Sequence, residues 1–136
     1  MRMASTQVLQ QFLGSGKVRG ALVMHDCRPR TASAALPDQA EARRRPDFSG
    51  AWSGDVYKAL IRLRVELDDH RVLVLDDDQG IGLIFRGEPD DRLDLSTADI
   101  SALTFEQFDA DKTRLLNLHS PVAFKGVLAA VASNRS

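Results

Sequence analysis

The clearest pattern in the chain lies between residues 59 and 67, where large apolar side chains alternate with charged ones. The apolar positions are Ile61, Leu63, Val65 and Leu67, and the charged positions between them are Arg62, Arg64 and Glu66. A period of two is typical of a β-strand with one face in water. A helix over residues 55–63 stays open, because Val56, Leu60 and Leu63 also have helical spacing. We expect a strand from about Leu60 onward.

Two further β-rich segments follow, at residues 71–75 and 81–86. Turn-forming residues separate all three segments, at 68–70 and again at 76–80, where Gly80 is free to take a positive φ. The turn-forming stretch Gly87-Glu88-Pro89-Asp90-Asp91 then ends the β pattern. The pattern predicts three antiparallel strands in a meander.

Both ends of the chain favour helices. Residues 5–13 have a possible cap in Ser5 or Thr6 and are stopped by Gly14-Ser15-Gly16, after which residues 17–24 read as a strand. Near the other end, Ser120 and Pro121 are typical of a helix start. The apolar stripe over residues 122–132 predicts a helix that packs on one face of the sheet.

The region between the meander and the last helix is ambiguous. Residues 93–95 are expected to form a short edge strand, and residues 96–99 a turn or one helical turn. Residues 100–118 fit a hairpin around Asp109-Ala110-Asp111-Lys112, which we favour. The alternative is a helix, because Thr104 and Gln107 have the spacing of a capping box.

These elements predict a single α+β domain over residues 1–136. Its sheet would be an antiparallel meander, with a short N-terminal helix and with a C-terminal helix packed on the sheet. Residues 28–50 contain three prolines, several Ala and Ser, and only Leu36 and Phe48 as large apolar side chains. This segment cannot bury much surface, so we expect a mobile loop.

Composition narrows the class of protein. The apolar fraction of 43% and the charged fraction of 27% are ordinary for a globular domain. The net charge of −1 gives the whole molecule no strong field for nucleic acid or membrane. The single cysteine excludes an internal disulfide, and no apolar run has the length of a signal peptide or membrane span. A cytoplasmic location is therefore expected.

No motif in the sequence predicts a reaction, a cofactor or a metal site. Gly14-Ser15-Gly16-Lys17 lacks the first glycine and the final Ser or Thr of a phosphate-binding loop. His25-Asp26-Cys27 could in principle activate a thiol, but the sequence offers no oxyanion hole beside it. The acidic turn at 76–80 lacks the full spacing of a calcium loop, and the three histidines are scattered.

The candidate binding residues surround the 28–50 segment. Phe48, Trp52 and Tyr57 flank its end, and an aromatic cluster there would anchor a protein partner. Trp52 could equally seal the core where the loop re-enters. Residues 1–50 have a net charge of +4 and residues 51–136 one of −5. Arg28, Arg30, Arg43, Arg44 and Arg45 could therefore contact nucleic acid.

We conclude from the sequence that a binding module is favoured over an enzyme. The first hypothesis is a small protein-interaction or regulatory module that binds a protein partner, or a second copy of itself, through a sheet edge or the 28–50 loop. The alternatives are a nucleic-acid-associated protein that uses the arginines, and a small enzyme with a site at His25 and Cys27.

Overall fold

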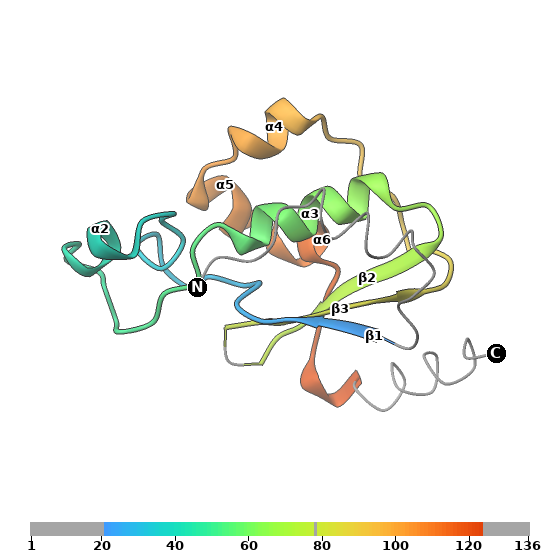
Figure 1. Ribbon diagram of the computed structural model, residues 1–136, viewed down its shortest axis with the longest axis horizontal. Coiled ribbons are helices and arrows are strands. Elements are labelled where there is room, and N and C mark those ends of the chain that lie inside the picture. The colour runs from blue at the N-terminus through green and yellow to red at the C-terminus, as the bar shows by residue number, and fades with distance from the viewer. Residues whose placement is uncertain (1–20, 78, 124–136) are drawn as a thin grey trace.

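The computed structural model describes residues 21–77 and 79–123, and it shows an α+β arrangement (Figure 1). The strands are β1 (Ala21–Met24), β2 (His70–Leu75), β3 (Ile81–Arg86) and β4 (Leu118–His119). The helices are α2 (Gln39–Arg43), α3 (Val56–Glu66), α4 (Thr97–Ser101), α5 (Phe105–Ala110) and α6 (Lys112–Leu116), followed by a 3-10 turn, η1 (Pro121–Ala123). The predicted N-terminal helix, the first residues of the predicted strand at 17–24 and most of the predicted C-terminal helix lie outside the described residues.

The four strands form one mixed sheet in the order β1-β3-β2-β4. β2 and β3 form the predicted hairpin, and Gly80 in its turn has a φ of 88°. β1 pairs antiparallel with β3, whereas β4 pairs parallel with β2. The predicted pure antiparallel meander is therefore wrong, although the α+β class is confirmed.

The strand expected from Leu60 onward is wrong, because this segment is the helix α3. The alternating pattern suggested a strand because Arg64 was counted as solvent-exposed. Its side chain is in fact buried, with 5% exposure. With Arg64 counted as buried, the inward positions are Val56, Tyr57, Leu60, Ile61, Leu63 and Arg64, which follow the helical rather than the strand period. The open alternative, a helix beginning near Asp55, was the correct one.

The hairpin favoured for residues 100–118 is also wrong. The segment forms the end of α4, then α5 and α6, and only residues 118–119 are a strand. Thr104 and Gln107 make both hydrogen bonds of the capping box at the start of α5, so the local capping signal was the correct one. Ser96 and Asp99 make a second capping box on α4, and no strand forms at 93–95.

Helices cover one face of the sheet. Figure 1 shows α3, α5 and α6 on this face with α4 outermost, and η1 on the opposite side of the sheet. The core between sheet and helices includes Met24, Leu60, Ile61, Val72, Val74, Ile84, Phe108, Leu115 and Leu116. Gly82 allows close packing here, since a Cβ atom on it would lie 2.8 Å from both the Sγ of Cys27 and a methyl carbon of Leu60.

The other face of the sheet is apolar as well. Leu73, Leu75, Leu83 and Phe85 are buried there in a second cluster. Their registers place Val23 of β1 on this same face, opposite Leu83. The sheet is therefore apolar on both sides, a property more common in sheets covered on both faces than in half-exposed ones.

The 28–50 segment is tied to the body at several points. It contains the short helix α2, capped by the side chain of Asp38. The backbone N–H groups of Ser53 and Gly54 both donate to the carbonyl of Ala34, at 2.9 and 2.8 Å. Ser33, Ala34 and Ala42 are buried, so the packing within this segment is provided by small side chains. The mobility of this segment stays a prediction.

Candidate functional site

The outer edge of β1 is the most exposed apolar feature of the sheet. β1 is the terminal strand of the sheet, and among the described residues no strand pairs with its outer side. Val23 is 49% exposed, although it lies on the apolar face opposite the buried Leu83. Of the large apolar side chains described, only Val122, at 88%, is also classed as exposed. An exposed edge with an apolar side chain is a template for pairing with another chain.

The opposite edge of the sheet, formed by β4, is less suited to pairing with an added strand. β4 is only two residues long, and it is followed closely by Pro121, which has no N–H to donate to a further strand. The two edges of the sheet are therefore unequal, and β1 is the edge that can accept an additional strand over several residues.

The three predicted aromatic residues do not share one surface. Tyr57 is 3% exposed and packs on Phe108 with their ring centroids 4.4 Å apart, so its ring belongs to the core. Burial raises the pKa of Tyr57 to about 12, and the negative charges of Asp55 and Glu106 add to the shift. Phe48 and Trp52 are half-buried.

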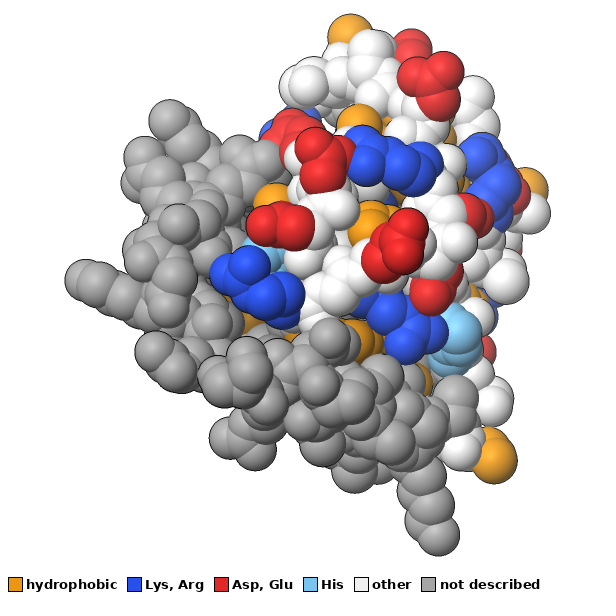
Figure 2. All heavy atoms as spheres, turned by 90° about the vertical axis from the view of Figure 1, so that its right-hand side faces the viewer, with side chains coloured by type: hydrophobic (Ala, Val, Ile, Leu, Met, Phe, Trp, Pro, Cys, Tyr) orange, Lys and Arg blue, Asp and Glu red, His pale blue; other side chains and the backbone are white. Residues whose placement is uncertain are grey.

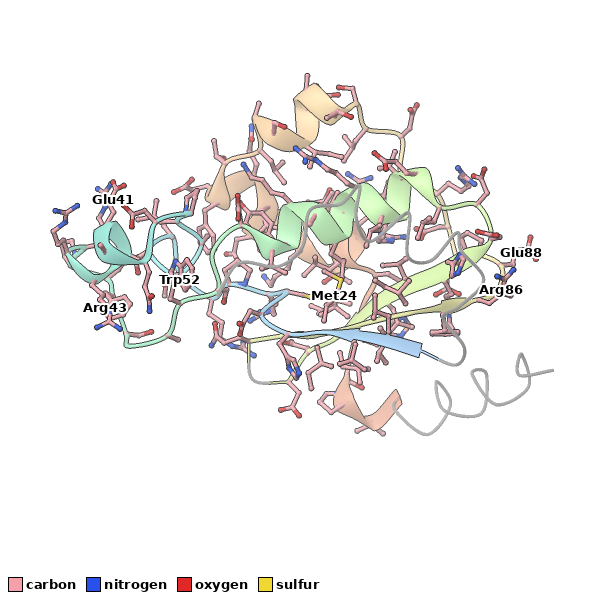
Figure 3. The ribbon with its side chains drawn as sticks, in the orientation of Figure 1. Met24, Glu41, Arg43, Trp52, Arg86 and Glu88 are labelled. Atoms are coloured by element: carbon pink, nitrogen blue, oxygen red, sulfur yellow. The ribbon has the colours of Figure 1, made fainter. Side chains whose placement is uncertain are left out.

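The indole of Trp52 is used within the chain. Its Nε1 donates to the carbonyl of Leu36 at 2.7 Å, and its ring lies against Gly54. Figure 3 shows Trp52 at the base of the arm that carries α2, where that arm meets the body. This placement fits the sealing role considered for Trp52, and its role as a partner anchor stays a prediction.

The five predicted arginines lie in two separate groups. Arg28 and Arg30 both face Asp76 in the β2–β3 turn, with nitrogen–oxygen distances of 3.2 and 3.3 Å. The Arg28 contact is an ion pair without hydrogen-bond geometry, since its buried Nε has no hydrogen-bond partner in the part of the chain that is described. This group is therefore neutralised in part by the body itself.

The second group lies on α2 and just after it. Arg43, Arg44 and Arg45 are exposed, and Arg45 pairs with Glu41 at 2.5 Å. Figure 3 shows Arg43 and Glu41 at the tip of the arm, pointing to opposite sides. Asp38, Glu41 and Asp47 match the three arginines in number, so residues 38–47 carry no net charge. Nucleic-acid binding by this tip stays a prediction, and the local charge balance weakens it.

The His25-Asp26-Cys27 triplet does not form an accessible thiol site. The side chain of Cys27 is completely buried, and its Sγ lies 3.5 Å from the carbonyl oxygen of Met24. Burial raises the pKa of this thiol to about 12, which leaves almost none of it ionised near neutral pH. His25 is exposed, and Asp26 turns the chain with a φ of 62°.

Sequence reasoning missed a polar cluster between β2, the 89–91 loop and the end of α6. Asp90 accepts from the Nε of Arg71 at 2.9 Å and from the Nδ2 of Asn117 at 2.7 Å. Asn117 also donates to the carbonyl of Val72, so its Oδ1 is left to accept from the Nε2–H of His119 at 3.1 Å. The available sequence signal was the asparagine itself, because Asn tolerates the left-handed φ, here 49°, with which a helix such as α6 can end.

A shallow hollow lies beside this cluster. Arg64, His70, Val72, Pro89, Asp90 and Asp91 line it. Arg64 donates to Asp91 and to the carbonyls of Arg114 and Leu115, so its guanidinium is used in joining parts of the fold. His70 contacts Asp69, with 2.8 Å between Nδ1 and Oδ1. Both carboxylates that line the hollow already have a cationic partner, Asp91 in Arg64 and Asp90 in Arg71, which does not favour a charged ligand.

The face around this end of the molecule is polar without a dominant sign. Figure 3 places Arg86 and Glu88 at this end, and Figure 2 views it directly, with acidic and basic side chains interspersed. Arg71 pairs with Asp90 and Arg86 with Asp69. Among residues 21–77 and 79–123, no group of three His, Cys, Asp or Glu side chains is placed to hold a metal ion.

Comparisons with known proteins add no assignment. Within the described ranges, no helix combines the length and the apolar character that crossing a bilayer requires. Neither a family model, nor a curated protein sequence, nor a solved structure matches this chain. The function is therefore inferred from the geometry described above.

Proposed function

We propose that the protein is a small interaction module that binds an extended segment of a partner protein along the outer edge of β1. The observation that carries this proposal is the half-exposed Val23, on an edge that no described strand covers. In this mode of recognition the backbone hydrogen bonds of the added strand provide affinity, and alternate side chains provide selectivity. The apolar face that includes Val23 and Leu83 would receive every second side chain of the partner.

The edge itself contains no device against such pairing. Residues 21–24 read Ala-Leu-Val-Met, without a charge and without a proline. Edge strands of monomeric proteins commonly carry a lysine, a proline or a bulge that prevents pairing. An edge that lacks a charge would also accept a second copy of the same chain, because two such edges do not repel each other.

The test is substitution of Val23 by Lys, which places a charge on the edge. Proteins retained by the immobilised chain from a nuclease-treated extract of its own cells are compared between variants by quantitative mass spectrometry. We expect Val23→Lys to lose the specific partner, because the charge must be desolvated in the paired sheet. Val122→Lys is the matched control, since Val122 is the other exposed large apolar residue of the described chain and lies outside β1.

Equal retention by the two variants would contradict the proposal. Circular dichroism checks that both variants fold. We expect that they do, because the side chains of Val23 and Val122 are exposed. Sedimentation equilibrium of the purified chain shows whether the partner is a second copy, in which case Val23→Lys shifts the mass to that of a monomer.

The second candidate function is nucleic-acid binding through α2. It is supported by Arg43 and Arg44, which have no carboxylate partner among the described residues. Its test is Arg43→Ala with Arg44→Ala. Nucleic-acid contact predicts binding that weakens steeply with salt and is lost in this double variant, whereas Val23→Lys leaves it unchanged.

A further inference from the structure

Two cations on α3 lack the carboxylate partner that the other cations of the body have. Between residues 51 and 123, ion pairs are formed by Arg64, Arg71, Arg86, Arg92, Lys112 and Arg114. Lys58 and Arg62 have none within the described part of the chain. They lie one helical turn apart, so their like charges repel each other on the helix surface.

Both cations donate to the same residue, Ser101, at the end of α4. The Nζ of Lys58 donates to the carbonyl oxygen of Ser101 at 2.8 Å. One terminal nitrogen of Arg62 donates to the hydroxyl oxygen of Ser101 at 2.7 Å. Two positive charges therefore converge on two neutral oxygens, at an exposed residue.

The acceptors at this point are too few for the donors. The Nε of Arg62 is buried and has no hydrogen-bond partner among the residues described. Burial lowers the pKa of Lys58; Asp55 opposes this shift and the charge of Arg62 adds to it. An anionic group at Ser101 would relieve the repulsion and supply oxygen acceptors.

We propose that Ser101 is a phosphorylation site whose phosphate is held by Lys58 and Arg62, fastening α4 to α3. The hydroxyl oxygen already lies at hydrogen-bonding distance from Arg62, so a phosphate on it would place its oxygens beside both cations. A guanidinium and an ammonium are the two side-chain groups that bind phosphate most strongly. Figure 1 shows α4 lying along the outer side of α3, where Ile100 already anchors it.

The covalent step is an ordinary phosphoryl transfer from a nucleoside triphosphate bound by a separate kinase. The bond between the Ser101 oxygen and the γ-phosphorus forms, and the bond from that phosphorus to the diphosphate breaks. The diphosphate leaves with the electron pair, and the hydroxyl proton passes to a base of the kinase. A covalent phosphate is favoured over a free one, because an attached group is held at high effective concentration.

One unfavourable term is the dipole of α4, since a negative charge at a helix C-terminus is destabilising. α4 has only five residues, so this term is small. Two direct contacts with cations outweigh it, because hydrogen bonds to charged partners are about twice as strong as neutral ones. The phosphate is therefore expected to tighten the contact between α3 and α4 rather than to loosen it.

The test uses the full chain with phosphoserine incorporated at position 101, studied by phosphorus NMR as a function of pH. The second ionisation of a free phosphoserine has a pKa of about 6. We expect the pKa of the phosphate at 101 to be about one unit lower in the folded protein than in the same chain in urea. Lys58→Met with Arg62→Met should remove this shift.

Arg86→Met is the matched control, because it removes a positive charge at a distant end of the molecule. The phosphoserine protein that carries this substitution should keep the shift. The proposal is overturned if folded and unfolded chains ionise at the same pH, or if the shift survives in the Lys58→Met, Arg62→Met variant.

A second experiment distinguishes a covalently attached phosphate from a free phosphate ligand. The unmodified protein is titrated with inorganic phosphate while the amide signals of Ser101 and Ala102 are followed. Weak or absent binding is expected, since the pair is partly exposed and two cations at such a surface hold a free anion only weakly against water. Saturation tighter than about 1 mM, without a shift in the phosphoserine protein, would overturn the covalent proposal and assign the site to a free phosphate ligand.

Discussion

The thiol of Cys27 has 0% exposure and sits between Gly82 and the end of β1. A pKa raised from 9.0 to about 12 lowers the thiolate population near neutral pH by about a thousandfold. We therefore expect iodoacetamide at pH 7.5 to label Cys27 at least about a thousandfold more slowly in the folded chain than in urea, because the thiolate is the reactive form. Intact-mass measurements over time check this.

Labelling at the rate of a free thiol in the folded protein would contradict that expectation and reopen the enzyme hypothesis at His25 and Cys27. The control is the same reaction in increasing urea. There the rate should rise in parallel with the unfolded fraction, since opening of the fold is then the route to the thiol.

At the scale of single residues, the sequence predicted positions whose conformation is locally determined. The positive φ of Gly80 and the capping pair of Thr104 and Gln107, which supported only the alternative to the favoured hairpin, follow from interactions a few residues apart. The burial of Arg64 could not be predicted in this way, because its partners are Asp91 and the carbonyls of residues 114 and 115. A charged side chain in a core is recognised only once its distant partners are known.

At the scale of elements, Arg64 joins α3, the end of α6 and the 89–91 loop. Replacing it with Met keeps much of the volume but leaves the carbonyl of Leu115 without this donor, and leaves that of Arg114 with only the 3.4 Å bond from the N–H of Asn117. Asp91 is 60% exposed and can be hydrated, so the loss comes chiefly from these carbonyls. We expect the free energy of unfolding to fall by about 1–3 kcal/mol in Arg64→Met, measured by urea denaturation.

Arg92→Met is the matched control for that substitution. Arg92 pairs with Asp68, but both side chains are more than half exposed. An exposed ion pair contributes about 0–1 kcal/mol, so this variant should remain close to the parent protein. Equal losses in the two variants would show that the buried hydrogen bonds of Arg64 contribute nothing beyond its charge.

Whether an element could be predicted also depended on how far apart in sequence its contacting residues lie. The β2–β3 hairpin was predictable, because a turn of a few residues sets its register. The pairing of β1 with β3 and of β4 with β2 joins segments far apart in sequence. Neither hydrophobic pattern nor turn chemistry contains that information, so the predicted meander put residues 60–67 beside β2, where β4 lies. The exposed edge of β1 became visible only with this topology.

At the scale of the whole molecule, the polar cluster around Asp90 connects a loop, two strands and the end of a helix. Burial opposes the ionisation of Asp90, but hydrogen bonds from Asn117 and Arg71 outweigh it and hold its pKa below the usual value. Asp69 is shifted in the same direction by its hydrogen bond with His70. Both carboxylates therefore hold their protons less tightly in the folded chain than in the unfolded chain.

This difference makes the stability of the protein depend on pH in the acid range. The unfolded chain binds more protons than the folded chain there, so the free energy of unfolding should fall as the pH drops below about 4, the ordinary value of an aspartate. The contribution is fully present above that pH and is lost as the folded carboxylates become protonated. Asp90→Asn should flatten this dependence, because it removes one of the groups responsible.

Urea denaturation at a series of pH values between 2 and 7 measures the effect. Glu88→Gln is the control, since Glu88 is exposed and makes no hydrogen bond or ion pair in the described part of the structure. This variant should keep the slope of the parent protein, while Asp90→Asn loses part of it. If both variants follow the parent curve in acid, the Asp90 cluster does not connect these elements in solution, and the parallel pairing of β2 with β4 beside it rests on its backbone hydrogen bonds.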